Sequence, residues 1–182
     1  MSMVILCVGK LKDRAYREMA DEYLKRLGRY GKTEETEVPD LPEPAGGASA
    51  ALEEQVRTRE GEAILAKIRP GDRVIALTIG GKQRSSEGLA EHLAELRTGG
   101  AGRLVFVIGG SLGLGKNVLE RADEELSMSP MTFPHRLARV MLLEQLYRAE
   151  KMLRMIAGER ERSVNMAWTL IERDSLPRVD RP

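Results

Sequence analysis

The chain alternates short apolar runs with stretches whose apolar residues recur every three or four positions, and this alternation constrains its fold more than any other feature. Short apolar runs are typical of buried strands, and the three-to-four spacing is typical of helices. Strands that alternate with helices form parallel sheets with helices on both faces, so we expect an α/β fold. The expected strands are residues 4–8, 33–38, 73–79, 103–108 and 126–129. The first expected helix is capped by Asp13 and ends at Gly28 or Gly31. The other expected helices are residues 52–68, 86–96, 116–125 and 136–156.

Length and composition favour one domain with a single sizeable core. The chain has 182 residues, of which 42% are hydrophobic, and this size suits one domain. Its single cysteine, Cys7, excludes an internal disulfide and lies in a short apolar run, which is typical of a buried structural thiol. No apolar run has the length of a membrane helix, and the N-terminus lacks a signal-peptide pattern. We expect a cytoplasmic protein without a membrane partner.

The charge balance excludes a strongly basic nucleic-acid-binding protein. Lys and Arg total 29 against 28 for Asp and Glu, whereas general nucleic-acid binders carry a marked basic excess. Basic side chains are in modest excess only in residues 136–182. Such an excess suits contact with a phosphate backbone, and a solvated helix face produces it as well.

A glycine-rich stretch follows the apolar run at residues 105–108. Residues 110–116 match the spacing of a phosphate-binding loop, but Asn117 stands where that loop needs a Ser or Thr hydroxyl to hold magnesium. The apolar run at residues 73–79 is followed by glycines, not by the acidic metal ligand of a nucleotide triphosphatase. The dinucleotide-binding fingerprint does not fit either, because Val118 stands where it needs its third glycine or an alanine. A phosphate-loop nucleotide-binding protein is therefore kept as a third hypothesis, ranked below the two that are introduced next.

A second loop-forming segment, Ser-Met-Ser-Pro-Met-Thr-Phe-Pro-His, occupies residues 127–135. Ligands of open α/β sheets bind outside the carboxyl ends of the strands, where loop backbone is free to form hydrogen bonds. The glycine-rich stretch at residues 109–115, called the glycine loop below, and this second segment are thus expected to meet around one small ligand. Glycines let main-chain groups approach a flat or zwitterionic ligand that needs no metal, and S-adenosylmethionine is such a ligand.

The chain also resembles a known family, the bacterial ribosomal large subunit pseudouridine N3-methyltransferases, which belong to the SPOUT class. The resemblance extends from about Met3 to Glu159. Seven short motifs carry it: Val8–Lys12, Glu22–Leu27, Leu77–Lys82, Ser85–Ala90, Phe106–Gly113, Met131–His135 and Glu144–Ala149.

The resemblance implies a fold, a reaction and partners. The fold would be a SPOUT-type parallel sheet flanked by helices with a C-terminal trefoil knot, formed by a single domain over residues 1–159. The reaction would be transfer of a methyl group from S-adenosylmethionine to N3 of a pseudouridine in 23S ribosomal RNA of the assembled 70S ribosome. The partners would be that RNA and a second copy of the chain in a homodimer, and no metal is expected.

The resemblance and the placement of individual side chains in the sequence together indicate roles for residues. The expected catalytic side chains are His135 and Arg139, although His135 also suits a simple cap or buttress of the last helix. His92, on an ordinary helix, is interpreted as a surface residue. Arg148, Lys151 and Arg154 step by three along one helix, where they either contact RNA phosphates or only solubilise the chain. The expected cofactor-binding residues are Leu77, Gly109, Met128, Ser129, Pro130, Met131, Thr132 and Phe133.

The end of the chain departs from the family pattern. Members of the family end in a short Tyr-His-Arg or Tyr-His-Lys tail that is implicated in the substrate side of the active site. Here Gly158 and Glu159 are followed by an atypical tail, residues 160–182, without histidine or tyrosine. The second hypothesis is therefore a ribosome-binding relative that keeps the cofactor pocket but lacks catalysis.

Overall fold

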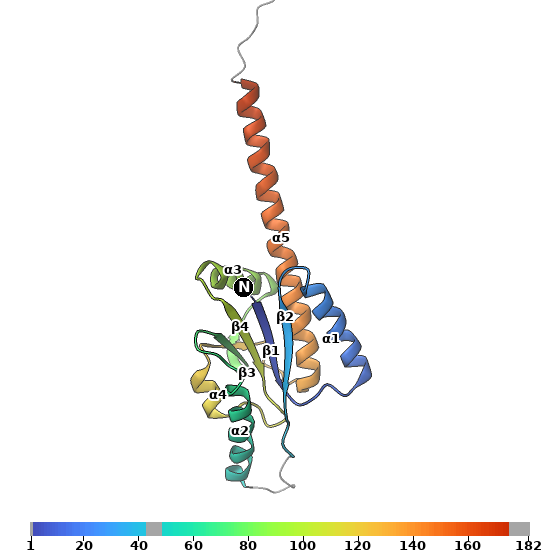
Figure 1. Ribbon diagram of the computed structural model, residues 1–182, viewed down its shortest axis with the longest axis vertical. Coiled ribbons are helices and arrows are strands. Elements are labelled where there is room, and N and C mark those ends of the chain that lie inside the picture. The colour runs from blue at the N-terminus through green and yellow to red at the C-terminus, as the bar shows by residue number, and fades with distance from the viewer. Residues whose placement is uncertain (1, 43–48, 175–182) are drawn as a thin grey trace, which may run out of the picture.

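The computed structural model describes the backbone of residues 2–42 and 49–174 and the side chains of that range as far as residue 158. Within it, five parallel strands form one sheet in the order β2-β1-β4-β3-β5 (Figure 1). The expected α/β fold with a parallel sheet is confirmed. The strands are β1 (Ser2–Val8), β2 (Thr33–Val38), β3 (Arg73–Gln83), β4 (Arg103–Ile108) and β5 (Glu124–Ser127).

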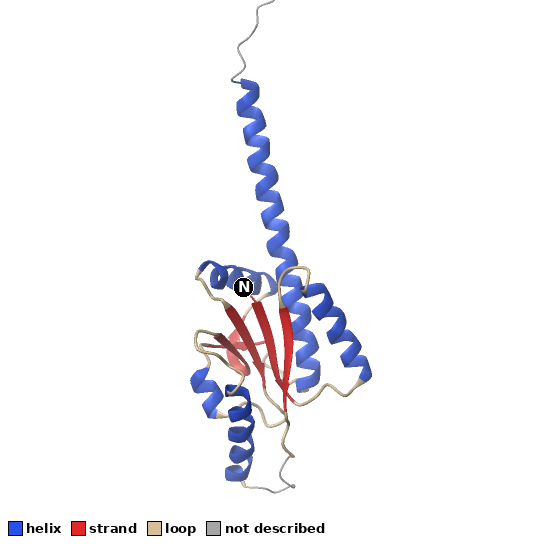
Figure 2. Ribbon diagram, in the orientation of Figure 1, coloured by secondary structure: helices blue, strands red, loops and turns tan. Residues whose placement is uncertain are grey.

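Helices cover both faces of the sheet (Figure 2). The helices are α1 (Arg14–Leu27), α2 (Ala50–Leu65), α3 (Ser86–Thr98), α4 (Lys116–Arg121) and α5 (His135–Asp174). One core cluster joins the sheet to α1, α3 and α5, and the other joins it to α2 and α4. Three helices begin where the sequence supplies a capping oxygen, since Asp13, Ser49 and Ser85 each accept a hydrogen bond from a backbone N–H of the first turn. In the described part of the chain, no helix combines the length and the apolar character needed to cross a bilayer.

The central strands β1 and β4 are buried on both faces. Ile5 and Phe106 pack into the cluster with α1, α3 and α5, while Leu6 and Val107 pack into the cluster with α2 and α4. Cys7 is fully buried in the same strand as Ile5 and Leu6, and burial raises the pKa of its thiol to about 12. The thiol is therefore protonated at neutral pH, and the expectation of a structural cysteine is confirmed.

Strand β3 is longer than its apolar run predicts, because it continues past Ile79 to Gln83. It pairs with β5 twice, once up to Leu77 and again from Lys82, and the intervening residues form a bulge. A Cβ atom on Gly81 would lie 2.7 Å from the carbonyl carbon of Glu125, so only glycine lets the two backbones approach this closely. The two glycines that were expected to end the strand instead shape a bulge inside it.

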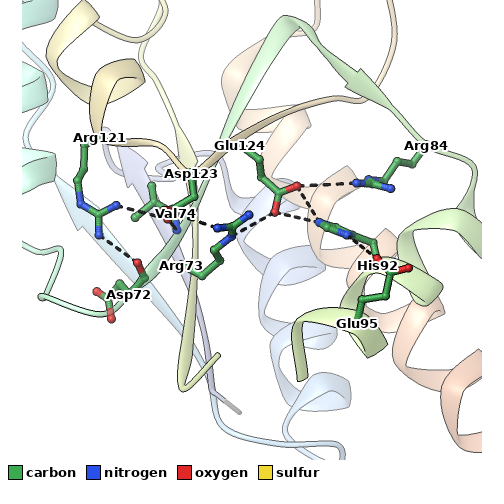
Figure 3. Close-up of polar contacts among 9 residues, drawn as sticks. All are labelled: Asp72, Arg73, Val74, Arg84, His92, Glu95, Arg121, Asp123 and Glu124. Atoms are coloured by element: carbon green, nitrogen blue, oxygen red, sulfur yellow. Dashed lines mark hydrogen bonds and ion pairs between the residues drawn. The ribbon is translucent and has the colours of Figure 1, made fainter. Parts of the chain in front are cut away.

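A polar network anchors the edge strand β5 to β3 and α3. Glu124 lies between Arg73, Arg84 and His92, and its carboxylate oxygen is 2.7 Å from Nε2 of His92 (Figure 3). Only 13% of the His92 side chain is exposed. The interpretation of His92 as a surface residue is therefore wrong, because the position of β5 against α3 covers the ring and no local pattern reveals it.

The last two helices differ from their expected bounds. Helix α4 ends at Arg121, four residues early, and the strand that follows begins at Glu124. Helix α5 begins at His135 and continues to Asp174, far beyond the body of the domain (Figure 1). Most of the atypical tail therefore continues this helix, while residues 175–182 lie outside the described residues.

The bulge predicts a sharp difference between two neighbouring glycines. Gly81→Ala is expected to lower the free energy of unfolding by about 1–3 kcal/mol, because its Cβ would overlap the backbone of Glu125 and Leu126. Gly80→Ala is the matched control, since a Cβ atom added there would meet no other atom within 4 Å, and it should change stability by less than about 0.5 kcal/mol. Urea unfolding monitored by circular dichroism compares the two, and equal losses would contradict the proposed backbone contact.

Candidate active site

A cavity of about 940 Å³ opens at the carboxyl edge of the sheet. This volume lies in the range of small-molecule sites. Three chain segments supply most of its wall: the bulge of β3, the glycine loop that follows β4, and the loop at residues 128–134 that precedes α5. The two loops that the sequence analysis expected to meet are brought together here. Of the expected cofactor-binding residues, those that line the cavity are Leu77, Gly109, Met128, Ser129, Met131, Thr132 and Phe133, whereas Pro130 does not line it.

The glycine loop folds tightly against itself. Gly110 and Gly113 form a β-bridge, and Gly113 has a φ of 84°, which favours glycine. A Cβ atom on Gly109 would lie 2.6 Å from the carbonyl carbon of Gly113, so a larger residue would open the turn. The glycines therefore keep the turn compact at this part of the cavity wall, where Ser111, Leu112 and Leu114 also line the cavity.

Helix α2 supports the glycine loop from behind. Asn117 donates a hydrogen bond from Nδ2 to the carbonyl oxygen of Thr58 at 3.0 Å. Gly61 of α2 faces the same Asn117, since a Cβ atom there would lie 2.3 Å from the amide oxygen. A glycine within a helix often marks such a close approach, and Gly61 is the one sequence signal for this contact. The loop is thus held at a fixed distance from α2.

Glu60 completes this support. Its carboxylate accepts a hydrogen bond from the backbone N–H of Leu41 at 2.9 Å and lies beside the Cα atom of Gly110. Burial raises the pKa of Glu60 above its ordinary value, against the lowering effect of the Leu41 hydrogen bond. Glu60 therefore connects the segment after β2 to the back of the glycine loop, a role that the sequence analysis missed.

The second loop is shaped by its serines. The hydroxyl of Ser127 donates to the carbonyl oxygen of Ser129 at 3.1 Å, and the backbone N–H of Met131 donates to the hydroxyl of Ser129 at 3.0 Å. Met131 and Ile79 stand at the cavity rim with 69% and 55% of their surface exposed. Apolar residues of this size at an open rim are available to cover a bound ligand.

The phosphate-loop hypothesis does not fit this geometry. Lys116 does not line the cavity; its side chain is 82% exposed and lies 3.6 Å from the carboxylate of Glu120. Asn117, which replaces the hydroxyl ligand, is bonded to α2 instead. The described residues also contain no group of three or more His, Cys, Asp or Glu side chains that could hold a metal ion. At the two positions of the phosphate-loop match, the described structure thus offers the cavity neither the lysine nor the hydroxyl that a nucleoside triphosphate requires.

The two expected catalytic residues lie in different places. His135, the first residue of α5, lines the cavity. Arg139 does not, because its side chain turns toward β1 and β2 and is 1% exposed. Its Nη1 donates to the carboxylates of Glu35 at 3.0 Å and Glu37 at 2.7 Å, and its Nη2 donates to the carbonyl oxygen of Gly9 at 2.8 Å. This placement gives Arg139 a structural role and removes it from contact with a ligand in the cavity.

The same carboxylates make the Arg139 contact sensitive to pH. Desolvation by burial raises the pKa of Glu37, but the hydrogen bond from the Leu11 N–H and the contact with Arg139 outweigh it, so that the pKa is lowered. A carboxyl group with a lowered pKa in the folded state stabilises the fold above its unfolded-state pKa and loses this contribution as the pH falls. The network is therefore strongest near neutral pH.

The expected RNA-binding residues lie on the surface of α5. Arg148 is ion-paired with Glu144, and half of its side chain is exposed. Arg154 stacks on the ring of Tyr30, with 6.0 Å from its guanidinium carbon to the ring centroid, and Lys151 is exposed. All three are placed where a large partner could reach them.

Arg139→Met is expected to lower the free energy of unfolding by about 3–5 kcal/mol, because Glu37 and the Gly9 carbonyl oxygen lose their buried partner and Glu35 keeps only Arg17 among its described partners. Arg148→Met, on the same helix, is the control and should cost far less stability, since half of its side chain is exposed and its ion pair is screened by solvent. Unfolding by urea at several pH values from 7 down to about 3 measures both, since the contribution of Glu37 is lost only below the ordinary pKa of a glutamate. The loss in the Arg139 variant should shrink as the pH falls and Glu37 becomes protonated, and equal losses in the two variants would contradict the network.

Comparisons with known proteins identify the family of the chain. A crystal structure described as a probable methyltransferase from Bordetella pertussis Tohama I is 17% identical in sequence, with a TM-score of 0.48 over 82% of this chain and 95% of that chain. The family model described as predicted SPOUT methyltransferase matches residues 1–157, a range that contains all the described residues that line the cavity. The chain therefore belongs to the SPOUT methyltransferase family.

Proposed function

We propose that the chain is an S-adenosylmethionine-dependent methyltransferase that acts on N3 of a pseudouridine in 23S ribosomal RNA of the assembled ribosome. Membership of the SPOUT family supports methyl transfer. The observation that carries the proposal further is the convergence of the glycine loop and residues 128–134 on one cavity, the arrangement expected for this cofactor. The pseudouridine specificity rests on the motifs that the chain shares with the N3-methyltransferases.

The residues of the cavity fit the cofactor. When bound, S-adenosylmethionine supplies an electrophilic methyl group on a sulfonium sulfur. Leu77 and Leu126 offer apolar surface to a flat adenine ring, and backbone groups at Gly109 and residues 128–133 are available to hydrogen-bond its edge. Such a wall needs no metal. The work of the protein is then to hold donor and acceptor in line, which is worth effective molarities of about 10⁵ M or more for well-aligned groups.

His135 is the residue that we assign to proton handling. The N3 atom of a pyrimidine must lose its proton to attack the methyl group. Among the described side chains that line the cavity, His135 alone carries an imidazole, the group whose ordinary pKa lies nearest neutrality. It can accept this proton or stabilise the anion that remains. Arg139, bonded to Glu35 and Glu37, is not part of this proposal.

The finer features of the family are proposed for this chain as well. We propose that the segment around residues 128–134 threads into a trefoil knot and that the protein works as a homodimer in the cytoplasm. Met155 and Ile156 on α5 are 58% and 46% exposed, which supports a contact with a second copy. Arg148, Lys151 and Arg154 would then contact ribosomal RNA phosphates.

A second candidate function has an observation of its own. The chain continues α5 where the family carries its Tyr-His tail, and residues 160–182 contain neither residue type that the tail supplies. A ribosome-binding relative that retains the cavity but does not transfer methyl groups would have this combination.

Two measurements separate the candidates. Isothermal titration should show binding of S-adenosylhomocysteine and none of ATP; the opposite result would favour the phosphate-loop hypothesis and overturn the proposal. Labelled S-adenosylmethionine should then transfer its methyl group to 70S ribosomes that lack the modification, and mass spectrometry of 23S RNA fragments should place the label on a pseudouridine. Cofactor binding without transfer would favour the ribosome-binding relative.

The two histidines of the chain provide a matched test of His135. His135→Ala is expected to slow methyl transfer by about 10²–10⁴-fold, the usual contribution of a positioned acid or base, with a small effect on S-adenosylhomocysteine affinity. His92→Ala removes the other imidazole, which is bonded to Glu124 and does not line the cavity, and should leave transfer unchanged. Single-turnover rates measure both, and an unchanged rate in the His135 variant would remove it from the chemistry.

A further inference from the structure

One cationic side chain reaches the cavity from outside the three segments that form most of its wall. Arg57 belongs to α2 and lines the cavity, whereas the other described lining residues include no Lys, Arg, Asp or Glu. Helix α2 packs on the face of the sheet opposite to α5, which contributes His135. A permanent positive charge therefore stands in a wall whose other described residues are apolar, glycine or uncharged hydroxyl side chains apart from His135, and it lies on a different helix from that imidazole.

The position of Arg57 is fixed by its backbone and by its side chain. A Cβ atom on Gly115 would lie 2.7 Å from the carbonyl oxygen of Arg57, so the glycine loop rests directly on this residue. Its Nε lies 2.8 Å from the carboxylate of Glu54, its Nη1 lies 3.7 Å from that of Glu53, and the side chain is 22% exposed. A guanidinium has five N–H donors, so these two pairs leave donors for a ligand.

We propose that Arg57 binds the carboxylate of the methionine portion of S-adenosylmethionine. This inference rests on the proposed function. The amino-acid end of the cofactor carries a carboxylate that loses water on entering the cavity, and an anion in such a place needs a cationic or hydrogen-bonding partner. Arginine matches a carboxylate with two parallel hydrogen bonds, which also fixes orientation. Among the described lining residues, Arg57 is the one side chain that supplies both the permanent charge and this geometry.

The contacts with Glu53 and Glu54 are compatible with this role. Both glutamates lie one helical turn before Arg57, so they hold the guanidinium from its own helix and do not cross the cavity. Neither glutamate lines the cavity. The contact with Glu54 is made by Nε of Arg57, and it orients the N–H groups on Nη1 and Nη2 of the same guanidinium. Arg57 thus acts as a binding residue for the amino-acid end, while Leu77 and the loop at residues 128–133 serve the adenosine end.

The test compares two ligands that differ in the amino-acid end. S-adenosylhomocysteine carries it, and 5′-methylthioadenosine lacks it. By isothermal titration, Arg57→Ala should weaken S-adenosylhomocysteine binding about 10-fold or more, the usual effect of losing a hydrogen-bonded charge partner, and leave 5′-methylthioadenosine binding unchanged. Arg57→Lys keeps the positive charge but lacks the paired N–H donors of a guanidinium, so it should restore part of the lost S-adenosylhomocysteine affinity. Arg59→Ala is the matched control, because Arg59 is exposed on the same helix and does not line the cavity.

The outcomes are distinguishable. Equal weakening of both ligands would overturn the proposal, because it would mean that Arg57 only supports the glycine loop. No weakening of either ligand would overturn it as well. Failure of the unaltered protein to bind S-adenosylhomocysteine or 5′-methylthioadenosine would instead refute the proposed function and, with it, the role of Arg57. Retained 5′-methylthioadenosine binding also shows that the variant is folded.

Discussion

The cavity depends on backbone segments that approach one another more closely than any side chain would allow. At Gly81 the bulge of β3 meets β5, at Gly109 the glycine loop folds on itself, and at Gly115 the loop rests on α2; at each position an added Cβ would lie within 2.7 Å of a backbone atom. Glycine is destabilising in regular strands and helices, so these positions cost conformational entropy. In exchange, the three close approaches bring the bulge of β3, the glycine loop and α2 together around one cavity.

The sequence predicted the parts of the structure that local pattern determines. The order of strands and helices followed from hydrophobic spacing, and caps such as Asp13 marked helix starts because their chemistry is local. The meeting of the two loops was also expected, since parallel strands direct their carboxyl ends to one edge. Arg139 was expected at the catalytic site but lies outside the cavity, because the rotation of α5 against the sheet depends on tertiary packing that local pattern does not determine. Arg57 was missed although Gly61, four residues later on the same helix, marks the face that contacts the glycine loop.

The buried Arg139 and its partly buried partners Glu35 and Glu37 influence the site without lining the cavity. Arg139 lies one turn after His135, so the bonds that tie it to β1 and β2 also set where α5 begins relative to the sheet. A buried ion pair contributes little net stability compared with apolar packing, but it penalises every arrangement that leaves one charge unpaired. Directional bonds of this kind fix the rotation of a helix better than apolar contacts do. The imidazole of His135 is thereby held at the cavity.

The tail of this chain departs from that of the pseudouridine N3-methyltransferases, which it resembles, and this departure affects one half of the proposed mechanism. The lining residues that the structure describes extend from Arg57 to Ala138, whereas the atypical tail begins after Glu159. The described part of the proposed cofactor site is therefore built from residues that precede the tail. Any contribution of the family's Tyr-His pair belongs to substrate recognition or proton transfer, and here His135 is the imidazole at the cavity that can take over the latter. The two halves are physically separate, so the cofactor site can persist while the substrate side diverges.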